Sequence, residues 1–143
     1  MDKVRIERLP ETKEMEGAKR WVEDKGEFAQ IAYGEAIRHL AFFELHQGFS
    51  RGSHYHVHKD ETFYVIKGRM FGVCVDMDTG VREELTVEKG EKVHIEPRCA
   101  HIFYGLEETL VVEYSSQKYD KEDAHKVEFG EPKDGKRLSA EGK

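Results

Sequence analysis

Three histidines and one glutamate are the residues whose types and spacing most clearly indicate chemistry. His54 and His56 occupy alternate positions of an extended segment, so their side chains share one face of a strand. Glu61 opens the next apolar segment after a short polar turn, and cross-strand pairing would bring its carboxylate to the histidines. His101 begins another apolar segment and shares a face with Phe103. Imidazoles and a carboxylate in an apolar interior need compensation, so this group predicts a divalent metal site.

The elements that must position this group are short strands. Between residues 28 and 115, apolar residues recur at period two or in short runs that are separated by glycine and polar turns such as Asp78-Thr79-Gly80. The predicted strands cover 28–33, 39–46, 53–57, 62–68, 70–77, 81–87, 91–96, 100–105 and 109–115. Because no helical pattern intervenes, the sequence predicts an all-β antiparallel sandwich or barrel.

The chain of 143 residues has the length of a single domain. We expect residues 1–27 to form an N-terminal arm, whose large apolar pair is Trp21 and Val22. Residues 28–115 are predicted to form the barrel. Residues 116–143 are predicted to form a charged extension with a disordered end, because that end is rich in Gly, Pro and charge.

Composition disfavours several classes of partner. A formal net charge of −6 disfavours the phosphate backbone of nucleic acid and anionic membrane surfaces. No apolar run approaches the roughly 20 residues of a membrane span, and the first residues do not resemble a secretory signal. We therefore expect a soluble, cytoplasmic protein in which Cys74 and Cys99 are buried thiols.

The spacing of the predicted metal ligands resembles the first motif of the cupin superfamily. That motif is matched at Gly48, His54, His56, Glu61 and Gly68. The spacing of the second cupin motif is matched by Gly90, Glu96, Arg98, His101 and Gly105. Only Gly90 and His101 keep the residue types of the second motif, so the resemblance leaves the conformation of that turn open.

The resemblance implies a single cupin-type jelly-roll β-barrel that forms a homodimer. It also implies that His54, His56, Glu61 and His101 bind one divalent transition metal ion, such as Fe, Mn, Zn or Ni, with coordination positions left open for catalysis. His58 has the same parity but ends its strand, where a solvated position or a contact to a ligand residue is expected.

Residues 106–129 more loosely resemble the end of the sugar and sugar-phosphate isomerase branch of cupins. Glu113 and Ser115 hold the strand positions of that pattern, and Glu122, Asp123 and Lys126 follow. The alternative interpretation is an ordinary last strand that is followed by a charged, solvated segment. Parity leaves two positions open for Glu113, the solvated face of the sheet or the metal cavity.

Three functions are consistent with these patterns. The first is an isomerase or epimerase that uses the metal as a Lewis acid on a small sugar-like or carbonyl substrate, with nearby groups that move the proton. Glu113 and Tyr114 are the candidate substrate-binding residues, and Tyr104 and Tyr64 are further candidates for proton transfer by their chemistry. The second is an Fe(II)-dependent dioxygenase. The third is a non-enzymatic barrel that binds metal or a small ligand.

Overall fold

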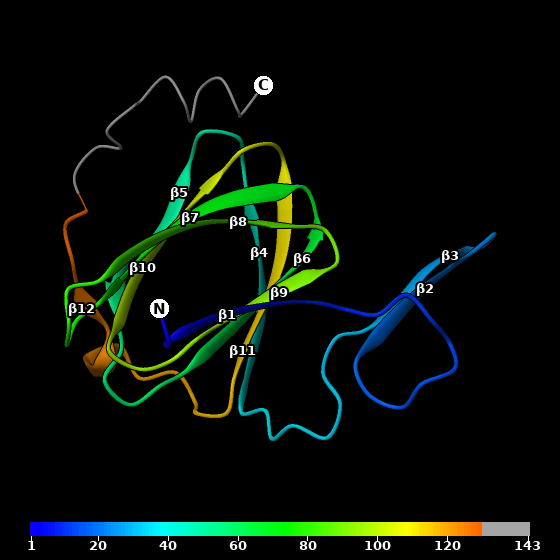
Figure 1. Cartoon of the computed structure of the whole chain (residues 1–143), viewed down its shortest axis with the longest axis horizontal. Helices are drawn as coiled ribbons and strands as arrows, with labels where there is room; N and C mark the ends of the chain where they lie inside the picture. The colour runs from blue at the N-terminus through cyan, green and yellow to red at the C-terminus, as the bar shows by residue number, and fades with distance from the viewer. Residues whose placement is uncertain (130–143) are drawn as a thin grey trace.

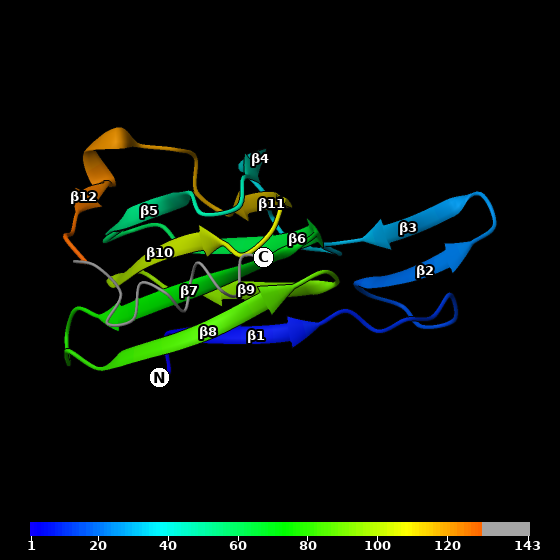
Figure 2. The same cartoon turned by 90° about the horizontal axis from the view of Figure 1, so that it is seen from above.

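A computed structural model describes residues 1–129, which form antiparallel strands in two facing sheets (Figures 1 and 2). The first sheet has the order β1 (Val4–Arg8), β9 (Glu91–Ile95), β6 (Glu61–Lys67), β11 (Thr109–Ser115) and β4 (His39–Leu45). The second has the order β12 (His125–Lys126), β5 (Ser50–Tyr55), β10 (Cys99–Gly105), β7 (Arg69–Asp76) and β8 (Arg82–Glu88). The predicted all-β jelly roll is therefore confirmed.

The core lies between the two sheets and follows from alternation along the strands. In β6 and β11, Phe63, Val65 and Val111 point between the sheets, whereas their neighbours point outward. Buried members of the core are Leu45, Phe63, Val65, Met70, Cys74, Leu85, Val87, Val93, Ile95, Cys99, Phe103 and Val111. Both cysteines are free and buried, as expected. The hairpin of β7 and β8 turns where it was predicted, with Gly80 at φ 78°.

The N-terminal segment differs from its prediction in two ways. Residues 1–27 were expected to lie outside the barrel, yet β1 pairs with β9 along the edge of the first sheet. This edge strand buries little, since Val4 is half-buried and Ile6 is exposed.

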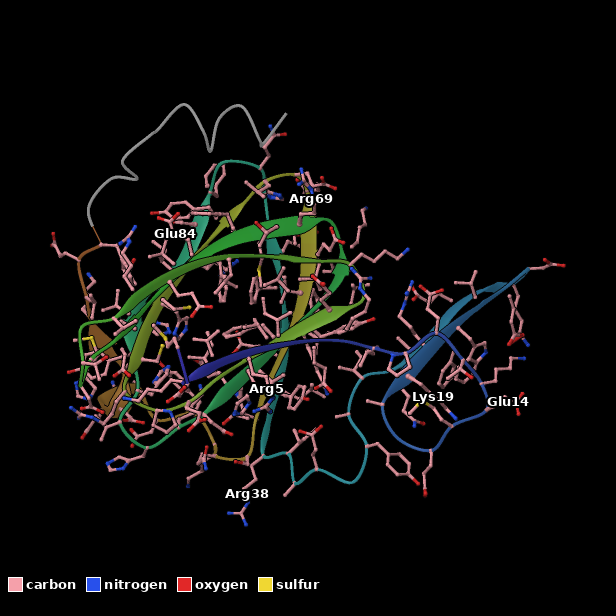
Figure 3. All side chains as sticks on the ribbon, in the orientation of Figure 1. Arg5, Glu14, Lys19, Arg38, Arg69 and Glu84 are labelled. Atoms are coloured by element: carbon pink, nitrogen blue, oxygen red, sulfur yellow. The ribbon has the colours of Figure 1, made fainter. Side chains whose placement is uncertain are left out.

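The strand predicted at 28–33 was assigned to the barrel, and this assignment was wrong. It appears as β3 (Gly26–Gln30), which pairs with β2 (Lys19–Glu23) in a separate hairpin that projects from the barrel (Figure 1). The rings of Trp21 and Phe28 stack across this hairpin with centroids 4.6 Å apart, so the strand has a local partner. Figure 3 shows Glu14 and Lys19 on this projecting segment, away from the barrel.

A glycine lets β5 approach β10 where the predicted ligands lie. Gly52 has φ 113°, and a Cβ at this position would lie 2.7 Å from the carbonyl oxygen of His101. The pairing register shifts between His101 and Ile102, next to the pair of His54 and His101. The close approach of the two backbones therefore places these histidines side by side.

After β11 the chain forms a 3-10 turn at Lys121–Asp123 and the short strand β12. The predicted disorder of the chain end concerns residues 130–143, which lie outside the described residues. Within residues 1–129, no helix is long and apolar enough to cross a bilayer.

Candidate functional site

Both sheets contribute to the predicted ligand group. Glu61 is the first residue of β6 in the first sheet, whereas His54 and His101 are paired on β5 and β10 of the second. His56 lies directly after Tyr55, the last residue of β5. The structure brings all four residues together, and His58 is exposed outside the group.

The side-chain atoms of this group converge on one point. The Nε2 atoms of His101 and His56 lie 3.1 Å and 3.3 Å from Oε1 of Glu61. One ligand atom each from His54, Glu61 and His101 lies within 4.8 Å of the other two. Nε2 of His56, Oε1 of Glu61 and Nε2 of His101 are buried and make no hydrogen bond with the described residues.

Backbone carbonyls fix the orientation of two of the imidazoles. Nδ1 of His56 donates to the carbonyl oxygen of Asp123 at 2.9 Å, and Nδ1 of His101 donates to that of Cys99 at 3.2 Å. A proton held on Nδ1 leaves the Nε2 lone pair directed at Glu61. This is the tautomer that a metal ligand requires.

Burial and the close contacts within the group shift three of its pKa values. Burial lowers the pKa of His54 to about 4, and the nearby His101 adds to this effect. Burial alone would raise the pKa of Glu61, but the close imidazoles of His101 and His56 hold it well below its usual value. Burial would also lower the pKa of His101, but the carboxylate of Glu61 outweighs it and raises that pKa.

These donors fit a divalent transition metal ion. Two ligand atoms at about 2.1 Å from one ion are about 3.0 to 3.4 Å apart in octahedral or tetrahedral geometry. The two measured separations from Oε1 of Glu61, 3.1 Å and 3.3 Å, lie in this range. Mixed imidazole and carboxylate donors suit Fe, Mn, Ni and Zn. The residue types and these two separations are therefore compatible with a bound ion.

The group lines one cavity of about 380 Å³, which is large enough for a small ligand. Phe43, Phe63 and Phe103 form its apolar wall. Further polar residues that line it are His39, Arg51, Lys59, Glu113 and Tyr119. Sequence analysis named only Glu113 among these. The sequence left two positions open for Glu113, the solvated face of the sheet or the cavity. Glu113 pairs with Phe63 and shares the inward face of that residue, so its side chain faces the cavity.

Lys59 is the missed residue with the clearest chemical character. It is 5% exposed, and its Nζ lies 3.6 Å from Oε2 of Glu61 and 5.3 Å from the ring centre of Tyr119. The sequence signal was only a lysine in the turn between His56 and Glu61.

Tyr114, the second predicted substrate-binding residue, does not line this cavity. Because it follows Glu113 in β11, its side chain lies on the opposite face of the sheet, where Lys92 donates to its hydroxyl at 3.2 Å. Tyr64 and Tyr104 also alternate with inward residues and are directed away from the cavity. His94 faces away as well, with Nδ1 2.9 Å from the hydroxyl of Thr62.

Comparison with known proteins points to enzymes that act on nucleotide sugars. Residues 18–136 match the family described as dTDP-4-dehydrorhamnose 3,5-epimerase. A curated Pseudomonas aeruginosa protein, UDP-2-acetamido-2,6-beta-L-arabino-hexul-4-ose reductase, is 30% identical over 113 residues. This alignment covers 75% of the present chain, which spans only 30% of the length of that relative.

Solved structures share the fold at low sequence identity. The dTDP-4-dehydrorhamnose 3,5-epimerase of Sulfolobus tokodaii has a TM-score of 0.70 and 18% identity, over 89% of this chain and 83% of that one. A Legionella pneumophila 3,5-epimerase in complex with dTDP-4-keto-L-rhamnose also has a TM-score of 0.70 and 18% identity, over 90% and 80% of the two chains. A mutant of the 3,4-ketoisomerase of Thermoanaerobacterium thermosaccharolyticum, in complex with TDP-4-keto-6-deoxyglucose, has a TM-score of 0.70 and 11% identity, over 99% and 95%.

Proposed function

Because this chain belongs to the dTDP-4-dehydrorhamnose 3,5-epimerase family, we propose that it is an epimerase or isomerase of a nucleotide-linked 4-keto sugar. The curated relative and the two ligand-bound structures are all named with keto sugars attached to a nucleoside diphosphate. In such a sugar, the C–H bonds beside the keto carbon are the acidic ones. Moving that proton would change a configuration or shift the carbonyl.

We further propose that His54, His56, Glu61 and His101 bind one divalent metal ion. The observation that carries this proposal is the convergence of three buried donor atoms that have no hydrogen-bond partner among the described residues. Burying such atoms unpaired costs about 1–3 kcal/mol each, and a bound ion would offset that cost. An ion bound here would act as a Lewis acid on the keto oxygen.

The other cavity residues would bind and orient the sugar. The Lys59 ammonium, buried beside the cluster, favours negative charge on an oxygen of the substrate. The Arg51 guanidinium also lines the cavity, where it can bind a diphosphate oxygen. The wall formed by Phe43, Phe63 and Phe103 would exclude water from the reacting carbon.

The direct test is turnover of defined keto sugars. TDP-4-keto-6-deoxyglucose and UDP-2-acetamido-2,6-beta-L-arabino-hexul-4-ose would each be incubated with the protein and followed by NMR. A changed configuration or carbonyl position supports the proposal and also identifies the nucleotide. Unchanged sugars contradict it. Oxygen consumption with added Fe²⁺ and no sugar turnover would favour the dioxygenase hypothesis instead.

We also propose that two copies of the chain associate. β4 is an edge strand, and its outward side chains Leu40 and Phe42 are 68% and 70% exposed. Val22 and Phe28 are exposed on the projecting hairpin. An edge with large apolar side chains favours pairing with a second copy.

A further inference from the structure

Within residues 1–129, two residues other than glycine have a left-handed backbone, and both lie next to histidines of the cavity. Ser53, with φ 69°, directly precedes His54, and Arg98, with φ 64°, lies in the turn before β10. A side chain makes this conformation costly for an L residue, so surrounding contacts must hold the residue in it. Such residues occur preferentially at functional sites. The turn at Arg98 is also the one whose conformation the sequence left open.

The backbone of Arg98 holds the loop that carries His56. Its N–H donates to the carbonyl oxygen of His56 at 2.6 Å, and its carbonyl oxygen accepts from the N–H of Met77 at 2.9 Å. His56 is 4% exposed, and its ring lines the cavity. The residue lies directly after β5 and outside the ladder of that strand. The bond from Arg98 therefore fixes the main chain of His56, whereas the bond to Asp123 fixes its ring.

The side chain of Arg98 contacts the same turn as its carbonyl oxygen does. Its Nε and Nη2 lie 2.7 Å and 2.6 Å from Oδ1 of Asp78, the residue after Met77. The other carboxylate oxygen, Oδ2, accepts from Nζ of Lys3 at 2.6 Å. Arg98 and Lys3 lower the pKa of Asp78 to about 2, so this carboxylate is charged at neutral pH. The left-handed conformation of Arg98 is therefore linked to its contact with Asp78.

We propose that the ion pair with Asp78 holds Arg98 in its left-handed conformation, and that this conformation positions His56 in the cavity. Glycine adopts positive φ without a steric cost. Arginine needs a contact that glycine does not need, and Asp78 supplies it. Arg98 is thus a positioning residue that acts through the main chain of His56. Its effect on catalysis rests on the proposed function.

Two single substitutions that remove the ion pair test this role. Asp78→Asn removes the charge of the acceptor, and Arg98→Ala removes the donor but keeps a side chain that disfavours positive φ. Both should lower kcat for the two keto sugars named above about 10- to 100-fold, because a displaced His56 misaligns the cavity. KM should change less than about threefold. An unchanged kcat in either variant would overturn the proposal.

Arg98→Gly separates the conformation of the turn from the charge of its side chain. It also removes the ion pair, but it removes the cost of positive φ as well. Its kcat should stay within about threefold of the unmodified protein. The double variant, Asp78→Asn with Arg98→Gly, should be as active as Arg98→Gly alone, so the loss caused by Asp78→Asn should disappear. A double variant as slow as Asp78→Asn would show that the carboxylate does not act through φ and would overturn the proposal.

Lys3→Gln is the matched control. It removes the second cation from the same carboxylate and leaves the contact of Arg98 with Asp78 in place. Its kcat should equal that of the unmodified protein. A loss as large as that of Asp78→Asn would show that the whole charged cluster matters, rather than the conformation of Arg98, and would contradict the inference.

NMR without sugar distinguishes this inference from the proposed function. The N–H of Arg98 should exchange with D₂O slowly in the unmodified protein and at least about tenfold faster in Asp78→Asn. The ring resonances of His56 should shift in Asp78→Asn and return in the double variant. Unchanged exchange and ring resonances in Asp78→Asn would overturn the inference even if both sugars react. If neither sugar reacts while these signals behave as expected, the proposed function fails and the positioning of His56 by Arg98 stands.

Discussion

His56 and Asp123 are joined by a hydrogen bond of 2.9 Å from Nδ1 to the main-chain carbonyl, although 67 residues separate them. The carboxylate of the same Asp123 accepts from the backbone N–H of Val57 and of His58, at 2.8 Å and 3.1 Å. The turn after β11 therefore holds the loop that carries His56 at three points, and one of them orients the imidazole itself.

Replacing Asp123 should weaken both the fold and the metal site. In Asp123→Ala, two partly buried amides lose a charged acceptor, which should lower the free energy of unfolding by about 1–3 kcal/mol. The loosened loop should also lower metal affinity about 10- to 100-fold. Denaturant unfolding and chelator competition measure the two effects. Asp120→Ala, which removes only the exposed cap of the 3-10 turn, is the control. Equal effects in both variants would contradict the role of Asp123.

The unmodified protein should bind one ion per chain. His56→Ala should lower metal content and melting temperature together, because an ion that binds only the folded state stabilises it. At 100 to 1,000 times its dissociation constant, an ion contributes about 3–4 kcal/mol. Elemental analysis and thermal melts with and without a chelator provide the measurement.

His94→Ala and His125→Ala are the controls for this experiment. His94 faces the other side of the sheet, and His125 stacks on the ring of Tyr55. Neither should change the metal content. A double variant, His54→Ala with His56→Ala, that keeps the ion at the normal ratio would refute the site.

Metal affinity should fall as the pH is lowered, because protons compete with the ion for the imidazoles. The carboxylate of Glu61 raises the pKa of His101 above its ordinary value, so this imidazole gains a proton at a higher pH than an ordinary histidine does. Burial lowers the pKa of His54 to about 4, so this residue should not compete above about pH 5. Competition with a chelator at pH 8, 7 and 6 should show the loss of affinity. A constant affinity over this range would contradict the role of His101.

Association of two copies should depend on the outer face of β4. Leu40→Ser combined with Phe42→Ser removes two exposed apolar side chains without touching the core. Sedimentation should show a dimer for the unmodified protein at micromolar concentration and a monomer for the double variant. Ile6→Ser, an exposed apolar change on the opposite edge strand, should leave the dimer intact. A monomeric unmodified protein would exclude the proposal.

The barrel could be predicted from the sequence because most of its strands have a recognisable local pattern of apolar residues bounded by turns. Alternation and glycine-bearing turns located the segments from β4 to β11 to within a few residues. β1 escaped prediction because it is a short edge strand in which three of the five residues are charged. The segment at 28–33 was misplaced because alternation identifies a strand but not its partner, which is β2.

The residues of the cavity were predicted only in part, because the sequence pattern does not show which strands pair with each other. The spacing of His54, His56, Glu61 and His101 along the chain predicted that they lie together, and their use as metal ligands stays a prediction. The contact between His39 and Glu113 depends on the register of β4 against β11, which no local pattern reveals. Tyr114 was predicted from the chemistry of its hydroxyl group alone. It is adjacent to Glu113 in β11, and adjacent residues of a strand point to opposite faces of the sheet.

The placement of Glu61 and His101 on opposite sheets also determines when the site forms during folding. Forty residues separate them, and their 3.1 Å contact exists only after β6 and β10 have come together across the sandwich. Contacts of such large sequence separation form slowly, after the local hairpins. Competence to bind an ion should therefore arise late, and an ion-sensitive signal would report closure of the two layers in a refolding experiment.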